Sequence, residues 1–382
     1  MKKLLPLLSL ILIFSCEPQD NTYFFVTTLG SDTLAIERIE RENGELEADV
    51  VLRSPSISLT QYEISWNDSK TLQALTATSF DKTFGEDGEG GTVIQNITSA
   101  GDSLNIETQG RNGMVNYTVA NDKSLLPFID MVHWPYDVAF TRAYQNTNDS
   151  TDQYLLSGRR ASNFIIHRVD GNDFTVRHPS RGVMDVKTDD NGNLTFLDAK
   201  GTTRKLKVYR TDKLDFDALT ERFLAIDAIG SPFGTLSPAV EESFNFKNTD
   251  FKVTYGSPQK RGRDIFGGIV SYGERWRTGA NRATHFSTTR DLTINGQKVP
   301  AGEYTLFSIP EENGGTLIIN KQTGQNGRSY NQERDLMRIE MTRAQSETFY
   351  EGFTVKVVET NNGGKIQLLW DKTSYEVAFQ LN

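Results

Sequence analysis

From about residue 23 onward the chain is built of short segments in which apolar and polar residues alternate, and this pattern constrains the fold more than any other feature. Turn-forming residues such as Gly30-Ser31-Asp32, Asn43-Gly44 and Asn67-Asp68 separate the segments. A period of two bounded by tight turns is typical of antiparallel strands with one buried and one solvated face. We therefore predict strands over the segments 23–30, 32–40, 45–54, 58–67, 71–80, 92–98, 103–109 and 114–120.

Two later segments depart from this alternation. Residues 124–145 are apolar on more than one side and contain two prolines, which predicts one or two short helices that close an opening in the sheet. Apolar residues at helical spacing that end at Gly230 predict one amphipathic helix over 212–230. Between them we predict strands over 163–169, 173–178, 182–188, 193–198 and 204–210.

So many antiparallel strands predict a mainly β protein with a few short helices. The first part, 23–230, is expected to form a large curved antiparallel sheet, a sandwich or a partly open barrel. Residues 231–238 contain two prolines and a glycine and are the predicted linker. A compact antiparallel β domain is expected over 239–382.

The N-terminus has the features of a lipoprotein signal. Lys2 and Lys3 precede an apolar run that is shorter than the roughly 20 residues that a membrane-spanning helix needs. The run ends in Ile13-Phe14-Ser15-Cys16, which resembles a bacterial lipobox. We predict a signal peptide over 1–15 and a lipidated tether over 16–22 that begins at Cys16. The alternative is a free thiol at the end of an ordinary signal peptide.

Composition then limits the partners. Cys16 is the single cysteine, so disulfides and cysteine-based zinc sites are excluded. The net charge of −9 disfavours a nucleic-acid partner, because phosphate binding needs a basic face.

We expect the lipid bilayer as a partner through Cys16, at the bacterial cell envelope and on the outer membrane. We expect no cofactor and no metal, since no zinc-protease motif is present and the strand histidines His167 and His178 are too few for a site.

The C-terminal part carries a series of unusual strings. They are Ser257-Pro258, Arg261-Gly262-Arg263, Trp276-Arg-Thr-Gly-Ala-Asn281, Ile294 to Tyr304, and Asn320-Lys321 with Gly324-Gln325. Together they resemble the domain-of-unknown-function family 2911. The resemblance implies a compact β domain in a secreted or membrane-attached bacterial protein, and it implies no activity. One departure is Asn326, where many members of the family have Trp.

A cluster of positive charge lies in this same part. Between residues 256 and 290 there are seven Lys and Arg residues and two acidic residues, a net charge of +5 in an acidic chain. Guanidinium groups bind carboxylates and phosphates through paired hydrogen bonds. We therefore predict an anion-binding pocket lined by the candidate residues Arg263, Tyr272, Trp276, Arg277, Asn281 and His285. The alternative is structural, with Trp276 in the core, Arg277 capping carbonyls and a tight turn at Asn281.

Three functional hypotheses follow. The protein is a non-enzymatic envelope lipoprotein that binds a small anionic or lipidic ligand or an envelope protein partner, a hydrolase that acts on an anionic substrate at the Arg277/His285 cluster, or a structural accessory subunit of an envelope assembly. An open, deep apolar groove under 124–145 would favour the binding protein. A pocket around Trp276 with a strongly perturbed His285 would favour the hydrolase. A broad exposed apolar patch without a pocket would favour the structural subunit.

Overall fold

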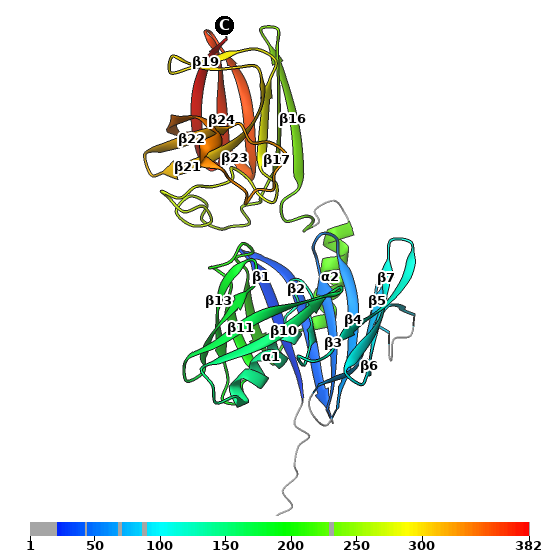
Figure 1. Ribbon diagram of the computed structural model, residues 1–382. Coiled ribbons are helices and arrows are strands. Elements are labelled where there is room, and N and C mark those ends of the chain that lie inside the picture. Colours follow the sequence, from blue (N-terminus) through cyan, green and yellow to red (C-terminus); the bar gives the residue numbers. More distant parts are fainter. Residues whose placement is uncertain (1–20, 43, 68–70, 86–89, 229–232, 382) are drawn as a thin grey trace, which may run out of the picture.

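The computed structural model of the protein describes residues 21–42, 44–67, 71–85, 90–228 and 233–381 (Figure 1). The predicted signal peptide 1–15 and Cys16 lie outside the described residues, as does the predicted tether up to residue 20. The described residues form one sheet of 15 strands and another of nine, which confirms a mainly β protein. No helix within the described ranges is long and apolar enough to cross a membrane.

The first sheet is a long antiparallel meander that grows in two directions from its centre. Strand β1 (Thr22–Leu29) lies in the middle and pairs with β2 on one side and with β15 on the other. The chain runs outward from β1 to β8, crosses to the far edge at β9, and returns strand by strand to β15. The pairing of β9 with β10 is parallel, and every other pairing is antiparallel. The remaining strands are β2 (Asp32–Glu42), β3 (Glu45–Leu52), β4 (Ser58–Trp66), β5 (Leu72–Phe80), β6 (Thr92–Ala100), β7 (Ser103–Gly110), β8 (Gly113–Ala120), β9 (Leu126–Pro127), β10 (Ser150–Ser157), β11 (Arg160–Asp170), β12 (Asp173–His178), β13 (Gly182–Thr188), β14 (Leu194–Asp198) and β15 (Lys207–Thr211).

Helix α1 (Trp134–Gln145) fills the space between the two arms of this curved sheet. Its Trp134 ring lies 5.8 Å from that of Tyr62 on β4, and its Phe140 ring lies 6.2 Å from that of Phe174 on β12. Both α1 aromatics are fully buried, and burying a side chain of this size stabilises the fold by about 2–3 kcal/mol. The segment 124–145 therefore forms one helix, preceded by the short strand β9.

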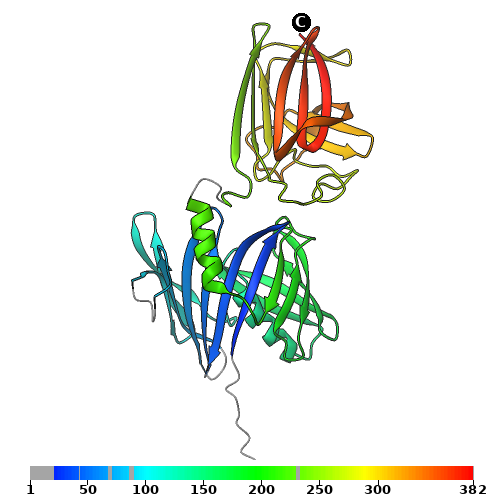
Figure 2. The same ribbon diagram turned by 180° about the vertical axis from the view of Figure 1, so that it is seen from behind.

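Helix α2 (Phe216–Ala228) covers the opposite face of the sheet, as Figure 2 shows. Its Phe216 and Phe223 join a separate apolar cluster with side chains of β2, β3, β4 and β5. The end of the helix is fixed by Arg53, whose Nε and Nη2 donate to the two carboxylate oxygens of Asp227 at 3.0 and 2.6 Å. The amphipathic pattern over 212–230 thus marked a real helix with one buried face.

The second sheet is antiparallel and forms the C-terminal part of the molecule. The tight turn Asn295-Gly296, with φ of 48° and 77°, joins β19 to β20 as its sequence predicts. The strand order is β16-β17-β18-β21-β22-β23-β24-β19-β20. The strands are β16 (Ala239–Phe246), β17 (Thr249–Gly256), β18 (Thr284–Thr288), β19 (Leu292–Ile294), β20 (Gln297–Val299), β21 (Gly302–Glu311), β22 (Gly314–Asn320), β23 (Asp335–Thr360) and β24 (Gly363–Leu381).

One segment differs from its sequence-based expectation. Residues 331–346 are rich in helix formers and suggest a short helix or a long loop, but they form a 3₁₀ turn (Gln332–Arg334) and the start of β23. Met337, Ile339 and Met341 are buried at every second position and pair along β22. Pairing and burial against a neighbouring strand outweigh the local helix preference.

The predicted linker 231–238 lies between α2 and β16. Its first two residues are outside the described ranges, and Phe233 is buried against the first sheet's core.

Candidate functional site

A cavity of about 1120 Å³ lies between the first domain, which contains the 15-stranded sheet, and the second domain, which contains the nine-stranded sheet. Loops at one end of the first sheet form one wall, residues 235–237 form a side, and loops of the second domain form the opposite wall. The lining contains one acidic side chain, that of Asp130. Against it stand six cations, three from each domain: Arg181, Arg204, Lys205, Arg263, Arg277 and Arg328.

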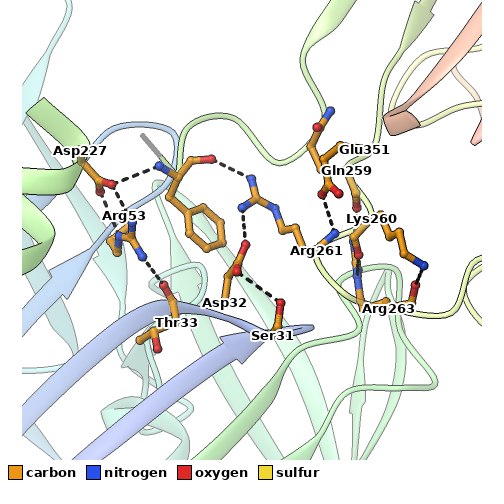
Figure 3. A network of polar contacts seen from close by, with 11 residues as sticks. Ser31, Asp32, Thr33, Arg53, Asp227, Gln259, Lys260, Arg261, Arg263 and Glu351 are labelled. Atoms are coloured by element: carbon orange, nitrogen blue, oxygen red, sulfur yellow. Dashed lines mark hydrogen bonds and ion pairs between the residues drawn. The ribbon is translucent and has the colours of Figure 1, made fainter. Parts of the chain in front are cut away.

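A close contact between the β1–β2 turn and the loop 259–263 fixes the two walls relative to each other (Figure 3). Ser31 N donates to Arg261 O at 3.0 Å, and Arg261 Nη1 donates to Asp32 Oδ2 at 3.1 Å. A Cβ on Gly30 would lie 1.8 Å from Arg261 O, and a Cβ on Gly262 would lie 2.7 Å from Ser31 Oγ. Two glycines with positive φ therefore allow this approach.

The first-domain wall is organised around Asp130. Arg181 donates to both of its carboxylate oxygens, and Arg204 donates to Oδ2. Burial acts to raise the pKa of Asp130, but the two guanidinium groups outweigh it and hold that pKa below its ordinary value. Asp130 is thus ionised and holds both arginines at the cavity wall, where their combined charge exceeds its own.

The loop 273–283 forms part of the opposite wall, and its backbone is held by β21. Trp276 exchanges backbone hydrogen bonds with Ser308, at 2.7 and 3.0 Å. The indole stacks on Trp370, with ring centres 6.0 Å apart, and meets the ring of Phe353 at 4.8 Å. The chain then turns sharply at Asn281, with a φ of 63°. Trp276 is therefore half-buried: it packs against the core and also lines the cavity.

Arg277 is half-buried at this wall. Its Nη1 makes one long contact, 3.5 Å, to Asn281 O. Within the described ranges no carboxylate forms an ion pair with it. Burial lowers the pKa of Arg277, and the neighbouring Arg328 guanidinium lowers it further. An anion in the cavity would relieve both effects, because it would supply the missing opposite charge.

The other cations of the 256–290 cluster have different roles. Arg263 lines the cavity, but its guanidinium also donates to Lys260 O and Gln259 O at 3.0 and 2.6 Å. Burial, followed by the nearby Arg261, lowers the pKa of Arg263 to about 10. Lys260 pairs with Asp371, and the guanidinium of Arg275 lies 4.0 Å from the Tyr330 ring centre. The charge cluster in the sequence thus divides between structural pairs and the cavity.

Two of the six predicted pocket residues lie elsewhere. Tyr272 lies beside Gly267 and near Arg343, whose guanidinium is 6.0 Å from the ring centre. His285 is on β18, where successive side chains point to opposite faces, and its Nδ1 lies 3.1 Å from Thr305 Oγ1. Neither residue lines the cavity, whereas Arg263, Trp276, Arg277 and Asn281 do.

Four cavity cations were not predicted. Arg181 and Arg204 lie in turns of the first domain that the chain folding brings to the same end of the sheet, and Lys205 and Arg328 lie beside them in the lining. The sequence contains only a weak signal for these four residues, because basic residues in turns are common on any protein surface. Asn326, at the position of the family's Trp, lines the cavity and uses its Oδ1 to accept from Arg328 N at 2.9 Å. Among the residues the structure describes, no three His, Cys, Asp or Glu side chains form a metal-binding group.

Comparison with known proteins finds one family that is similar to part of this chain. No curated protein matches the chain. A crystal structure of S. cerevisiae core factor is similar with a TM-score of 0.13 and 8% identity, over 95% of this chain and 57% of that chain, and so weak a likeness carries no argument. Residues 237–379, from the connecting segment into β24, match the family described as Protein of unknown function (DUF2911). The match covers the second sheet and the loop that carries Trp276 and Arg277, and it confirms that the C-terminal part is similar to family DUF2911.

Proposed function

We propose that the protein is a bacterial cell-envelope lipoprotein, anchored through lipidated Cys16, that binds a small anionic ligand in the cavity between its two domains. The observation that carries this proposal is the charge of the lining. Six cations face one carboxylate in a chain whose net charge is −9. An excess of positive charge around one concave space attracts an anion to it.

The state of Arg277 supports the same role. This half-buried guanidinium faces Arg328 and has no carboxylate partner among the residues that the structure describes, so its charge is destabilised in the free protein. Binding an anion would turn this cost into a favourable, charge-assisted contact. Met131, Ile269 and Trp276 also line the cavity, so a ligand with an apolar part beside its charge would fit it best.

The binding role is favoured over the hydrolase alternative by the position of His285. A general base must come within hydrogen-bond reach of the reacting group. His285 lies outside the cavity lining that contains Arg277 and contacts Thr305 on the neighbouring strand. We therefore propose binding without catalysis.

Native mass spectrometry of the protein extracted from its own membrane tests the proposal. We expect wild type to carry a bound anion and Arg277→Ala to lose it, with a nearly unchanged thermal transition because Arg277 makes only one long polar contact. Arg282→Ala is the matched control, since Arg282 is exposed on the same loop and does not line the cavity. Absence of any bound ligand in wild type, or equal loss in both variants, would contradict the proposed site.

Attachment of the anchor is tested separately. Labelled palmitate should be incorporated into wild type and not into Cys16→Ser, because the sulfur is the attachment point. Incorporation into both proteins, or into neither, would contradict the predicted lipoprotein.

A further inference from the structure

A second, much smaller cavity of about 30 Å³ lies in the first domain beside the large one. The two share five lining residues, Asp130, Met131, Arg181, Thr202 and Arg204. The small cavity therefore adjoins the cationic wall that Asp130 organises. Its volume suits one water molecule or one oxygen atom of a larger group.

His178, the last residue of β12, lines this small cavity and is 9% exposed. Its ring is held by aromatic contacts, with the ring centres of Phe164 and Phe128 at 4.8 and 5.6 Å. The Nδ1 atom accepts a hydrogen bond from Ser180 N at 3.1 Å. Because Nδ1 accepts, the proton of the neutral ring is on Nε2.

The Nε2–H group has no partner. Nε2 is buried and forms no hydrogen bond with any of the described residues. A buried donor without a partner costs about 1–3 kcal/mol, and an acceptor that enters the small cavity and bonds to it would remove this cost. His178 lines the same small cavity as Arg181 and Arg204.

We propose that this small cavity is the inner end of the ligand site and receives one oxygen atom of a phosphate group, whose other atoms lie in the large cavity. One phosphate oxygen accepts from His178 Nε2–H, and the other free oxygens face Arg181 and Arg204. The inference rests on the proposed function and adds the chemical class of the ligand. A carboxylate has two oxygens, which one guanidinium can occupy, whereas a phosphate offers a separate oxygen to each of three donors.

Burial, followed by the neighbouring Arg181, lowers the pKa of His178 to about 4, so the ring is neutral near pH 7. It therefore contributes a hydrogen bond without adding charge. Selectivity for phosphate would come from the number of donors, while the arginines supply the attraction. The phosphate has two chemical sources, free phosphate and a phosphorylated lipid headgroup, and the apolar side chain of Met131 at the shared wall is compatible with either.

Isothermal titration of the mature protein with inorganic phosphate and with dihexanoyl phosphatidic acid tests the proposal. In His178→Asn the side-chain oxygen can take the place of Nδ1, but the Nε2 donor is lost. In His178→Gln the amide reaches the position of Nε2 and keeps a donor. We expect about a tenfold weaker affinity in His178→Asn, which corresponds to about 1.4 kcal/mol, and an affinity within about threefold of wild type in His178→Gln.

The outcomes separate this inference from the proposed function. Tighter binding of the lipid than of free phosphate identifies a headgroup, and the reverse identifies the free ion. Phosphate binding that is equal in wild type and His178→Asn overturns the His178 subsite. If wild type binds neither probe yet carries a ligand in native mass spectrometry, the phosphate class is wrong and the anion site stands. If no ligand is found in either experiment, both proposals are wrong.

Discussion

At the scale of single residues, the two cavity linings each contain a buried or half-buried side chain with polar atoms that lack hydrogen-bond partners among the described residues. Arg277 and His178 belong to different domains, and each keeps part of its polar surface unsatisfied in the free protein. Such groups cost stability, and a ligand that supplies the missing partner recovers this cost. Burial of His178 also lowers its pKa, which makes the stability of the fold sensitive to pH.

The pH prediction concerns His178, whose pKa falls from 6.5 to about 4 on burial. The unfolded ring takes up a proton near pH 6.5 and the folded ring does not, so the fold loses stability as pH falls from above 6.5 toward 4. Between about pH 7.5 and about pH 5 this amounts to about 2 kcal/mol. His178→Asn lacks the effect, so its melting temperature relative to wild type should rise as the solution is acidified. A difference that is independent of pH would show that His178 titrates normally.

At the scale of elements, helix α1 depends on a distant carboxylate. Its N-cap residue, His133, makes no side-chain capping hydrogen bond. Instead Glu37 of β2, which is fully buried, accepts from His133 N at 2.8 Å and from Trp134 N at 3.0 Å. A negative charge there satisfies free N–H groups and interacts favourably with the helix dipole.

Glu37→Ala should therefore lower the free energy of unfolding of the first domain by about 3 kcal/mol, since it leaves buried N–H groups without acceptors. Glu37→Gln keeps one accepting oxygen and should cost less. Glu45→Ala, at an exposed position of β3, is the control and should change stability by no more than about 0.5 kcal/mol. Chemical denaturation of the three variants measures this order. Equal effects at positions 37 and 45 would show that α1 does not rely on Glu37.

At the scale of the whole molecule, the cavity depends on the junction between the domains. Gly30→Ala would place a methyl group against Arg261 O and force the junction open. We expect a larger radius of gyration in X-ray scattering and weaker anion binding, with both sheets intact. Gly101→Ala is the matched control, because Gly101 also lies in a two-residue hairpin turn and its φ of 62° is close to the 65° of Gly30. No atom lies within 4 Å of a methyl group added at Gly101. Each substitution carries the same backbone cost of about 1 kcal/mol. An equal response in both variants would mean that the junction does not control the cavity.

The sequence by itself determined the local features of this protein. Alternation predicted most of the strands, the Asn295-Gly296 pair predicted its turn, and helical spacing predicted α2, because each signal is confined to neighbouring residues. The strings around Trp276 identified the C-terminal family. The loop with Arg277 was also recognised as a place of concentrated charge.

The tertiary structure decided what those features do together. The segment 331–346 became a strand because β22 supplied a pairing partner that no local propensity reveals. His285 and Tyr272 do not line the cavity, because strand alternation in one case and loop packing in the other direct their side chains elsewhere. Arg181 and Arg204 do line the cavity, because folding brings two turns of the first sheet against a loop of the other domain. A cavity between domains depends on contacts between residues far apart in the chain, and such contacts leave no periodic trace in the sequence.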